Sequence, residues 1–155
     1  MNILIYLIDK KNNNLETDLF INYVSRFNKL SDLLKIPNIK VIYLDNKKCK
    51  SAKDETIMLK RRIISNSYKI FLDNLGQKLN SVEFSKKIFQ KQEDGLENIS
   101  FLIGGAYGIP KDYKKEGDLI LSLGDMVWPH ELIKIFLAEQ IYRAANIRLG
   151  KPYHK

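Results

Sequence analysis

Cysteine is almost absent from this sequence: Cys49 is the only one among 155 residues. One thiol cannot form an internal disulfide, and the flanking sequence KKCKS holds no histidine or second cysteine, so no metal site is expected there. No apolar run approaches the roughly 20 residues that a membrane-spanning helix needs. These absences predict a protein of the reducing cytoplasm with no metal and no membrane partner.

Glycine is missing at the place where a dinucleotide-binding fold needs it. The apolar segment 2–8 is typical of a buried strand, and the DKKNNN sequence after it has no glycine for the turn that holds a pyrophosphate. Neither GKS nor GKT occurs, so the phosphate-binding loop of common nucleotide triphosphatases is absent as well. Both gaps argue against a nicotinamide-dependent enzyme and against an ATPase or GTPase of that type.

Acidic residues are outnumbered, 18 against 26 lysines and arginines, which leaves a formal net charge of +8. The excess is concentrated in two segments. Basic residues are dense between positions 47 and 69, where only Asp54 and Glu55 oppose them, and residues 140–155 contain no acid. A lysine-rich genome would also raise the charge, but the clustering favours a partner with phosphates, such as a nucleic acid.

Strand-like and helix-like segments alternate along the chain. Apolar runs typical of buried strands occupy residues 2–8, 36–45, 68–73, 98–105 and 118–124, and helical spacing of apolar residues occupies 15–30, 52–67, 80–92, 109–117 and 130–150. Asn80 and Glu83 have the spacing of a helix capping box. The alternation predicts a single α/β domain over residues 1–155, with a mostly parallel sheet flanked by helices.

Three strand ends hold residues suited to a ligand, since ligands of parallel sheets collect where the strands end. The first holds Leu72 and Asp73, the second is IGGAYG at 103–108, and the third is GDMVWPH at 124–130. Glycine lets the backbone approach a ligand closely, and the apolar side chains of the third segment would form a wall for a flat ring. The plain alternative is that these segments are structural turns and that Trp128 is packed in the core.

Three segments of the second half follow one another in a specific order: FLIGGAYG, LSLGDMVWPHEL and AEQIYRAANIRLGKPYHK. With these motifs the chain resembles the bacterial ribosomal large-subunit pseudouridine N3-methyltransferase family of the SPOUT superfamily. The likeness covers nearly the whole chain; it is specific over residues 99–155 and mainly one of pattern before them. It implies an α/β domain whose C-terminal segment forms a trefoil knot, a topology that periodicity does not reveal.

The same resemblance implies that S-adenosylmethionine is the cofactor. Its expected contacts are Leu72, Gly105, Gly124, Asp125, Met126, Val127, Trp128 and Pro129. The implied reaction is methyl transfer to N3 of a pseudouridine in 23S rRNA, for which the N3 proton must leave. The favoured base is His130, because a helix N-terminus favours the neutral imidazole. Asp125 is the second candidate, and a capping or structural role of His130 is the alternative.

The end of the chain is expected to contact RNA. Arg143, Tyr153 and His154 carry the YRA and PYHK motifs, in which an aromatic ring can stack on a base while cations hold phosphates. A frayed terminus is the alternative. The segment 130–150 is apolar nearly all round, which predicts deep burial. Together with the resemblance it implies a homodimer, in which the tail of one subunit completes the site of the other.

The combined expectation is a cytoplasmic, homodimeric, S-adenosylmethionine-dependent enzyme that methylates 23S rRNA, with assembled ribosomes as better substrates than free RNA. Two alternatives remain. One is a related knotted methyltransferase acting on transfer RNA, which the PYHK ending and the lack of an extra RNA-binding domain disfavour. The other is a non-catalytic RNA-binding or ribosome-associated factor, which would keep affinity for ribosomes without binding the cofactor.

Overall fold

Five parallel strands form one sheet in the computed structural model, which describes residues 1–154 and leaves Lys155, the last residue of the PYHK motif, outside the described residues. The strands are β1 (Asn2–Leu7), β2 (Lys40–Tyr43), β3 (Tyr68–Lys78), β4 (Asn98–Ile103) and β5 (Leu119–Ser122). Their order is β2-β1-β4-β3-β5, and every neighbouring pair is parallel. The predicted α/β architecture is confirmed, and the five apolar runs are its strands.

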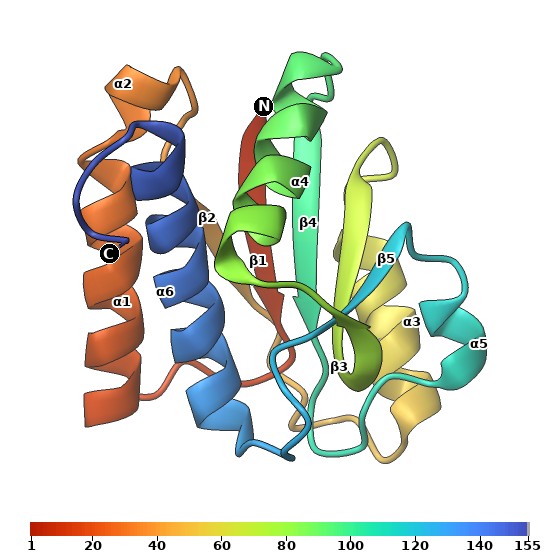
Figure 1. The fold of residues 1–155 in the computed structure, drawn as a ribbon. Helices are drawn as coiled ribbons and strands as arrows, with labels where there is room; N and C mark the ends of the chain where they lie inside the picture. The colour runs from red at the N-terminus through yellow and green to blue at the C-terminus, as the bar shows by residue number, and fades with distance from the viewer. Residues whose placement is uncertain (155) are drawn as a thin grey trace.

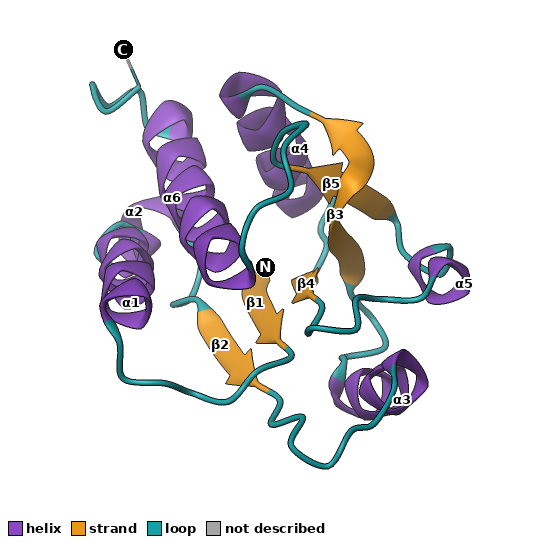
Figure 2. Ribbon diagram, turned by 90° about the horizontal axis from the view of Figure 1, so that it is seen from below, coloured by secondary structure: helices purple, strands orange, loops and turns teal. Residues whose placement is uncertain are grey.

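The helices cover both faces of the sheet (Figures 1 and 2). One face carries α1 (Leu15–Asn28), α4 (Ser81–Glu93) and α6 (His130–Arg148), and the other carries α3 (Ala52–Arg62) and α5 (Lys111–Lys114). The larger hydrophobic core lies under the first group and the smaller one under the second. Because both faces are covered, β4 is buried along its whole length, and its sequence is mostly apolar, with Asn98 and Ser100 as buried polar residues.

The start of α4 has the predicted capping box. Asn80 Oδ1 accepts a hydrogen bond from the backbone N–H of Glu83 at 2.9 Å, and Glu83 Oε2 accepts one from the backbone N–H of Asn80 at 2.9 Å. This pair satisfies two N–H groups that have no partner within the helix. Asn14 and Ser51 cap α1 and α3 with their side chains in the same manner.

Two elements differ in kind from the prediction, and α3 ends at Arg62 and not at residue 67 as predicted. A single-turn helix, α2 (Ser31–Leu34), follows α1 where no helix was predicted, because one turn is too short to show a period. Strand β3 continues past residue 73 to Lys78, and it does so with a bulge: Leu121 of β5 is paired with both Leu72 and Gln77. The residues between these two partners are not paired with β5, and their polar sequence gave no strand signal.

Helix α6 is buried mainly by its own chain, between α1 and α4 (Figure 2). Leu137, Ala138, Ile141, Ala144 and Ala145 are almost fully inaccessible. The predicted deep burial is therefore confirmed, but packing within one chain accounts for most of it. Among the described residues, none of the helices combines the length and the apolar character that crossing a bilayer requires.

Candidate functional site

The ends of β3, β4 and β5 surround a cavity of about 390 Å³, the first cavity. Three loops form its walls: the bulge of β3, the glycine-rich loop after β4 and the loop between β5 and α6, all near the carboxyl edge of the sheet (Figure 1). Of the residues predicted to hold a cofactor, its lining includes Leu72, Gly105, Gly124, Met126, Val127 and Trp128. Residues separated by some 50 positions in the sequence thus share one cavity, as parallel strand ends dictate.

Two glycines of this cavity are required by their surroundings. A Cβ on Gly105 would lie 2.4 Å from Oε1 of Glu55, too close for any other residue to fit without a shift. Gly124 has a φ of +139°, which side chains of L-residues rarely adopt. Glycine is therefore required at position 105 by the space that Glu55 occupies and at position 124 by the backbone conformation.

Glu55 is a site residue that the sequence did not reveal. It lies on α3 behind Gly105 and is 1% exposed, although glutamate is rarely buried without a partner. Its Oε1 accepts a hydrogen bond from Asn46 Nδ2 at 2.6 Å, and its Oε2 has no hydrogen-bond partner. In the sequence Glu55 is one of several charged residues of a helix with a polar face, so no local signal marks it.

Asp73 also lies in the wall of the first cavity, where it pairs with Lys114 of α5. Burial alone would raise the pKa of Asp73, but the hydrogen bonds from Lys114 and from the backbone N–H of Leu75 outweigh it and lower the pKa. The carboxylate is thus held in its charged form. This ion pair ties the β3 bulge to α5 on the far side of the sheet.

Trp128 stands between the first cavity and a second one. Its ring packs edge-on against Phe136 of α6, with centroids 5.0 Å apart and planes at 80°. The indole N–H is buried and has no hydrogen-bond partner. An unsatisfied buried donor costs free energy, so it is a group that a ligand can satisfy. The plain reading, a tryptophan packed in the core, is not what the structure shows.

Two residues predicted to hold the cofactor do not line the first cavity. The carboxylate of Asp125 points away to pair with Lys78, and its side chain is 80% exposed. Pro129 is the N-cap of α6, with a φ of −54° that suits proline at the entrance of a helix. Pro129 therefore shapes the loop from outside the wall, and the Asp125 side chain faces solvent in place of a ligand.

His130, the first residue of α6, lines the first cavity. Burial lowers the pKa of its imidazole below the usual 6.5, and the carboxylates of Asp9 and Glu131 oppose this without outweighing it. The ring is therefore neutral at pH 7 and able to accept a proton. The direction of this pKa shift agrees with the expected neutral imidazole, and its main cause is the burial of the ring.

The predicted RNA-binding residues come together on α6 and the tail around Glu139. Its Oε1 accepts hydrogen bonds from Arg143 Nη2 at 2.6 Å and from the Tyr153 hydroxyl at 3.1 Å. The Arg143 guanidinium lies 4.9 Å from the centroid of the Tyr153 ring, and His154 Nδ1 lies 3.5 Å from Arg143 Nη1. Glu139 thus holds the tail against α6. Nothing in the sequence marks Glu139 as a residue of this cluster.

Comparison with known protein families shows to which family this chain belongs. The sequence matches the profile of the family described as "Predicted SPOUT methyltransferase" over residues 1–154. The chain belongs to this family. Its SPOUT relatives include the ribosomal RNA large subunit methyltransferase H of Roseobacter denitrificans, 36% identical, and that of Paracoccus denitrificans, 37% identical. Each alignment spans 140 residues, which is 90% of this chain and 90% of the relative.

A solved structure gives a more distant likeness to this SPOUT family member. The crystal structure of the SpoU methyltransferase AviRb from Streptomyces viridochromogenes, in complex with the cofactor AdoMet, matches with a TM-score of 0.43 and 10% identity. The match covers 97% of this chain and 58% of that one.

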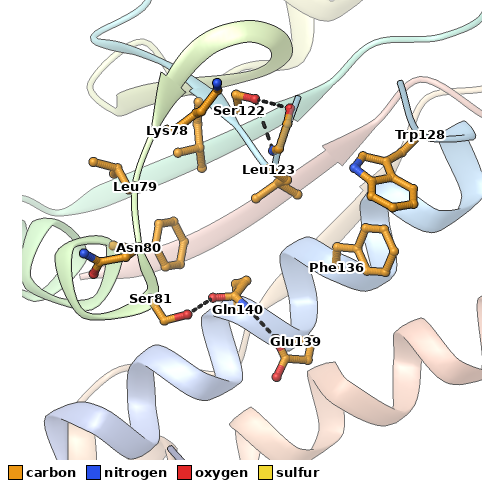
Figure 3. A pocket seen from close by; sticks show the side chains of 13 residues that line it. Lys78, Leu79, Asn80, Ser81, Ser122, Leu123, Trp128, Phe136, Glu139 and Gln140 are labelled. Carbon is orange, nitrogen blue, oxygen red and sulfur yellow. Dashed lines mark hydrogen bonds between the residues drawn. The ribbon is translucent and has the colours of Figure 1, made fainter. Parts of the chain in front are cut away.

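A second cavity, of about 520 Å³, adjoins the first in this SPOUT family member (Figure 3). Its lining comes from the end of β3, the start of α4, the end of β5, the loop after β5 and α6: Lys78, Leu79, Asn80, Ser81, Phe84, Leu121, Ser122, Leu123, Gly124, Trp128, Phe136, Glu139 and Gln140. Within residues 1–154, no three His, Cys, Asp or Glu side chains are grouped as a metal site requires.

Proposed function

We propose that this protein transfers the methyl group of S-adenosylmethionine to N3 of a pseudouridine in 23S rRNA. Membership of the SPOUT methyltransferase family and the relatives named ribosomal RNA large subunit methyltransferase H support a methyltransferase acting on ribosomal RNA. The observation that carries the proposal is the first cavity, which joins the glycine loop, Trp128 and His130 at one edge of the sheet.

The first cavity has the features that S-adenosylmethionine needs. Its walls are mainly apolar, and the glycine-rich loop after β4 brings the backbone to its surface. Leu72, Gly105, Gly124, Met126 and Val127 would hold the cofactor. When bound, the cofactor supplies an electrophilic methyl group on a positively charged sulfur. The sulfur is neutral once the methyl group has been transferred.

His130 acts as the base in this proposal. N3 of pseudouridine carries a proton, and the nitrogen needs its electron pair to form the new bond to carbon. The neutral imidazole of His130 takes that proton, which the burial of the ring allows at pH 7. Asp125 is the weaker candidate, because its carboxylate is exposed and paired with Lys78.

RNA binding is assigned to Arg143, Tyr153 and His154 at the cluster around Glu139. The proposal also includes the cytoplasmic location, the C-terminal trefoil knot, a homodimer and action on the assembled ribosome. In support of a dimer, Leu75 and Val127 beside the first cavity are each 81% exposed, although both are apolar. A second subunit that covers this rim would also bring its own basic tail close to the site.

The test is transfer of labelled methyl from S-adenosylmethionine to ribosomes from cells that lack this protein, followed by nucleoside analysis. Label in N3-methylpseudouridine of 23S rRNA is the expected result. Label only in transfer RNA would show that transfer RNA, and not 23S rRNA, is the substrate. Binding to ribosomes with no label on any RNA, and no affinity for the cofactor, would establish the non-catalytic factor in place of the enzyme.

A further inference from the structure

The two cavities meet along the loop between β5 and α6. Leu121, Leu123, Gly124 and Trp128 belong to the walls of both. In methyl transfer the accepting atom must lie about 3–3.5 Å from the methyl carbon. The acceptor therefore has to occupy space that adjoins the cofactor, and the second cavity provides such space. Two further hollows, one beside Leu33 and one beside Phe89, share no lining residue with the first cavity.

The second cavity has aromatic side chains on one side and hydrogen-bonding side chains on the other (Figure 3). Trp128 and Phe136 meet at 80° and form an aromatic corner. Across from them, Gln140 Oε1 accepts from the Ser81 hydroxyl at 2.8 Å, and Gln140 Nε2 donates to Glu139 Oε2 at 2.7 Å. A flat ring with polar edges suits such a space, because the aromatic side chains can stack on its face and the hydrogen-bonding side chains can bond to its edge.

The far end of this cavity leads to the cluster around Glu139. One carboxylate oxygen of Glu139 is bonded to Gln140 in the cavity wall, and the other to Arg143 and Tyr153 outside it. Lys78 marks the opposite rim, where Asp125 neutralises it.

We infer that the second cavity receives the target nucleobase, a uracil-type ring turned out of the RNA, with its N3 edge at the boundary with the first cavity, which His130 lines. This inference rests on the proposed function. The ring offers carbonyl oxygens and N–H groups on its edges. The unpartnered Trp128 N–H matches a carbonyl, and the Gln140–Glu139 chain matches the N–H and carbonyl groups of the other edge. Its volume of about 520 Å³ lies within the range of ligand sites.

The test is a steric block that leaves the first cavity unchanged. Ser81 lines only the second cavity, so Ser81→Tyr fills it from the α4 side. The matched control is Val82→Tyr, which places the same side chain one residue further along α4, at a half-exposed position outside both cavities. Gln140→Ala, which removes the hydrogen-bonding wall and keeps a helix-favouring residue, decides the question if Ser81→Tyr does not fold.

Three quantities are measured for each variant: affinity for S-adenosylhomocysteine by calorimetry, kcat/KM for ribosomes, and mass in solution. We expect Ser81→Tyr and Gln140→Ala to lower kcat/KM by about tenfold or more, with cofactor-product affinity unchanged within about twofold. Val82→Tyr should match the unmodified protein in all three.

The outcomes separate the inference from the proposed function. If the unmodified protein neither binds S-adenosylhomocysteine nor transfers methyl groups, the proposed function fails and the inference fails with it. If the unmodified protein is active and the folded cavity variants are equally active, only the nucleobase site is overturned. A change of mass in solution together with lost cofactor affinity would also overturn it, since the second cavity would then hold a part of a second copy of this chain.

Discussion

The carboxylate of Glu55 occupies the place where a side chain at position 105 would have to begin. A Cβ built on Gly105 lies 2.4 Å from Oε1 and 2.8 Å from Oε2 of Glu55, a glutamate that is almost fully buried. The glycine loop of the first cavity is thus positioned by α3, a helix from an earlier part of the chain. Three residues depend on one another here, because Asn46 holds the carboxylate that sets the loop.

Gly105→Ala should therefore lower affinity for S-adenosylmethionine by about tenfold or more, equivalent to about 1.4 kcal/mol. The new methyl group collides with Glu55, and either the carboxylate or the loop must move. Glu55→Ala removes the obstacle, so in that background Gly105→Ala should cost much less. Calorimetric titration of the four proteins of this double-mutant cycle measures the coupling. Equal costs of Gly105→Ala in both backgrounds would contradict the steric account.

Trp128 is the only tryptophan of the chain, so its fluorescence reports on the wall between the two cavities. Addition of S-adenosylhomocysteine should change the emission, because a ligand in the first cavity alters the surroundings of the indole. Trp128→Phe should abolish the signal and keep the fold. A saturating titration by calorimetry with no change in emission would place the ligand away from Trp128.

His130 should impose a pH dependence on methyl transfer. Burial lowers its pKa below 6.5, so the rate is expected to fall only as pH falls below 6.5, where the base becomes protonated. His130→Gln should lower kcat by about a hundredfold and remove this acidic limb. His154→Gln is the matched control for the only other histidine; it should retain the limb whatever it does to KM. An acidic limb that survives in His130→Gln would assign it to another group.

The same lowered pKa has a consequence for stability. The unfolded chain binds a proton at position 130 at higher pH than the folded protein does. The free energy of unfolding should therefore decrease as pH falls through 6.5, because protonation favours the unfolded chain. His130→Gln removes this contribution. Urea denaturation of both proteins between pH 7.5 and 5.5 measures it, and parallel pH dependences would contradict the assignment.

Arg143 is expected to contribute to RNA binding and not to cofactor binding. Arg143→Ala should raise KM for ribosomes and leave affinity for S-adenosylhomocysteine unchanged, since Arg143 lines neither cavity. Tyr153→Phe separates the hydrogen bond that holds the tail on Glu139 from the aromatic ring that can stack on a base. It removes the hydrogen bond to Glu139 and keeps the ring, and because burial raises the pKa of Tyr153 to about 12, the hydroxyl is present throughout the neutral range. A cofactor affinity weakened equally by both variants would contradict this division.

Asn80→Ala tests the capping box of α4. The change should lower the free energy of unfolding by about 1 kcal/mol, because the N–H of Glu83 loses its partner. Asn80→Asp keeps an acceptor at the same place and is the control. Chemical denaturation gives both values, and an alanine variant as stable as the aspartate variant would show that the cap contributes nothing measurable.

Much of the architecture followed from local patterns. Continuous apolar runs predicted the five strands, and the Asn80–Glu83 spacing predicted the start of α4, because both signals act over a few neighbouring residues. The bulge of β3 did not follow, since it depends on how Leu121 of β5 pairs with two residues far away in the sequence. The burial of α6 was predicted, but its main cause is contact with α1 and α4 within one chain.

The candidate site divides in the same manner. The glycines of the IGGAYG and GDMVWPH segments, His130 and the tail residues are visible in the amino-acid order, because their types are unusual and closely spaced. Glu55 and Glu139 are not, because a glutamate on a helix looks the same in the sequence whether it faces solvent or a buried loop. For the other residues the direction of the side chain was decisive, and the tertiary structure sets it. Asp125 and Trp128 are only three positions apart, yet Asp125 points outward to Lys78 and Trp128 lies between the two cavities.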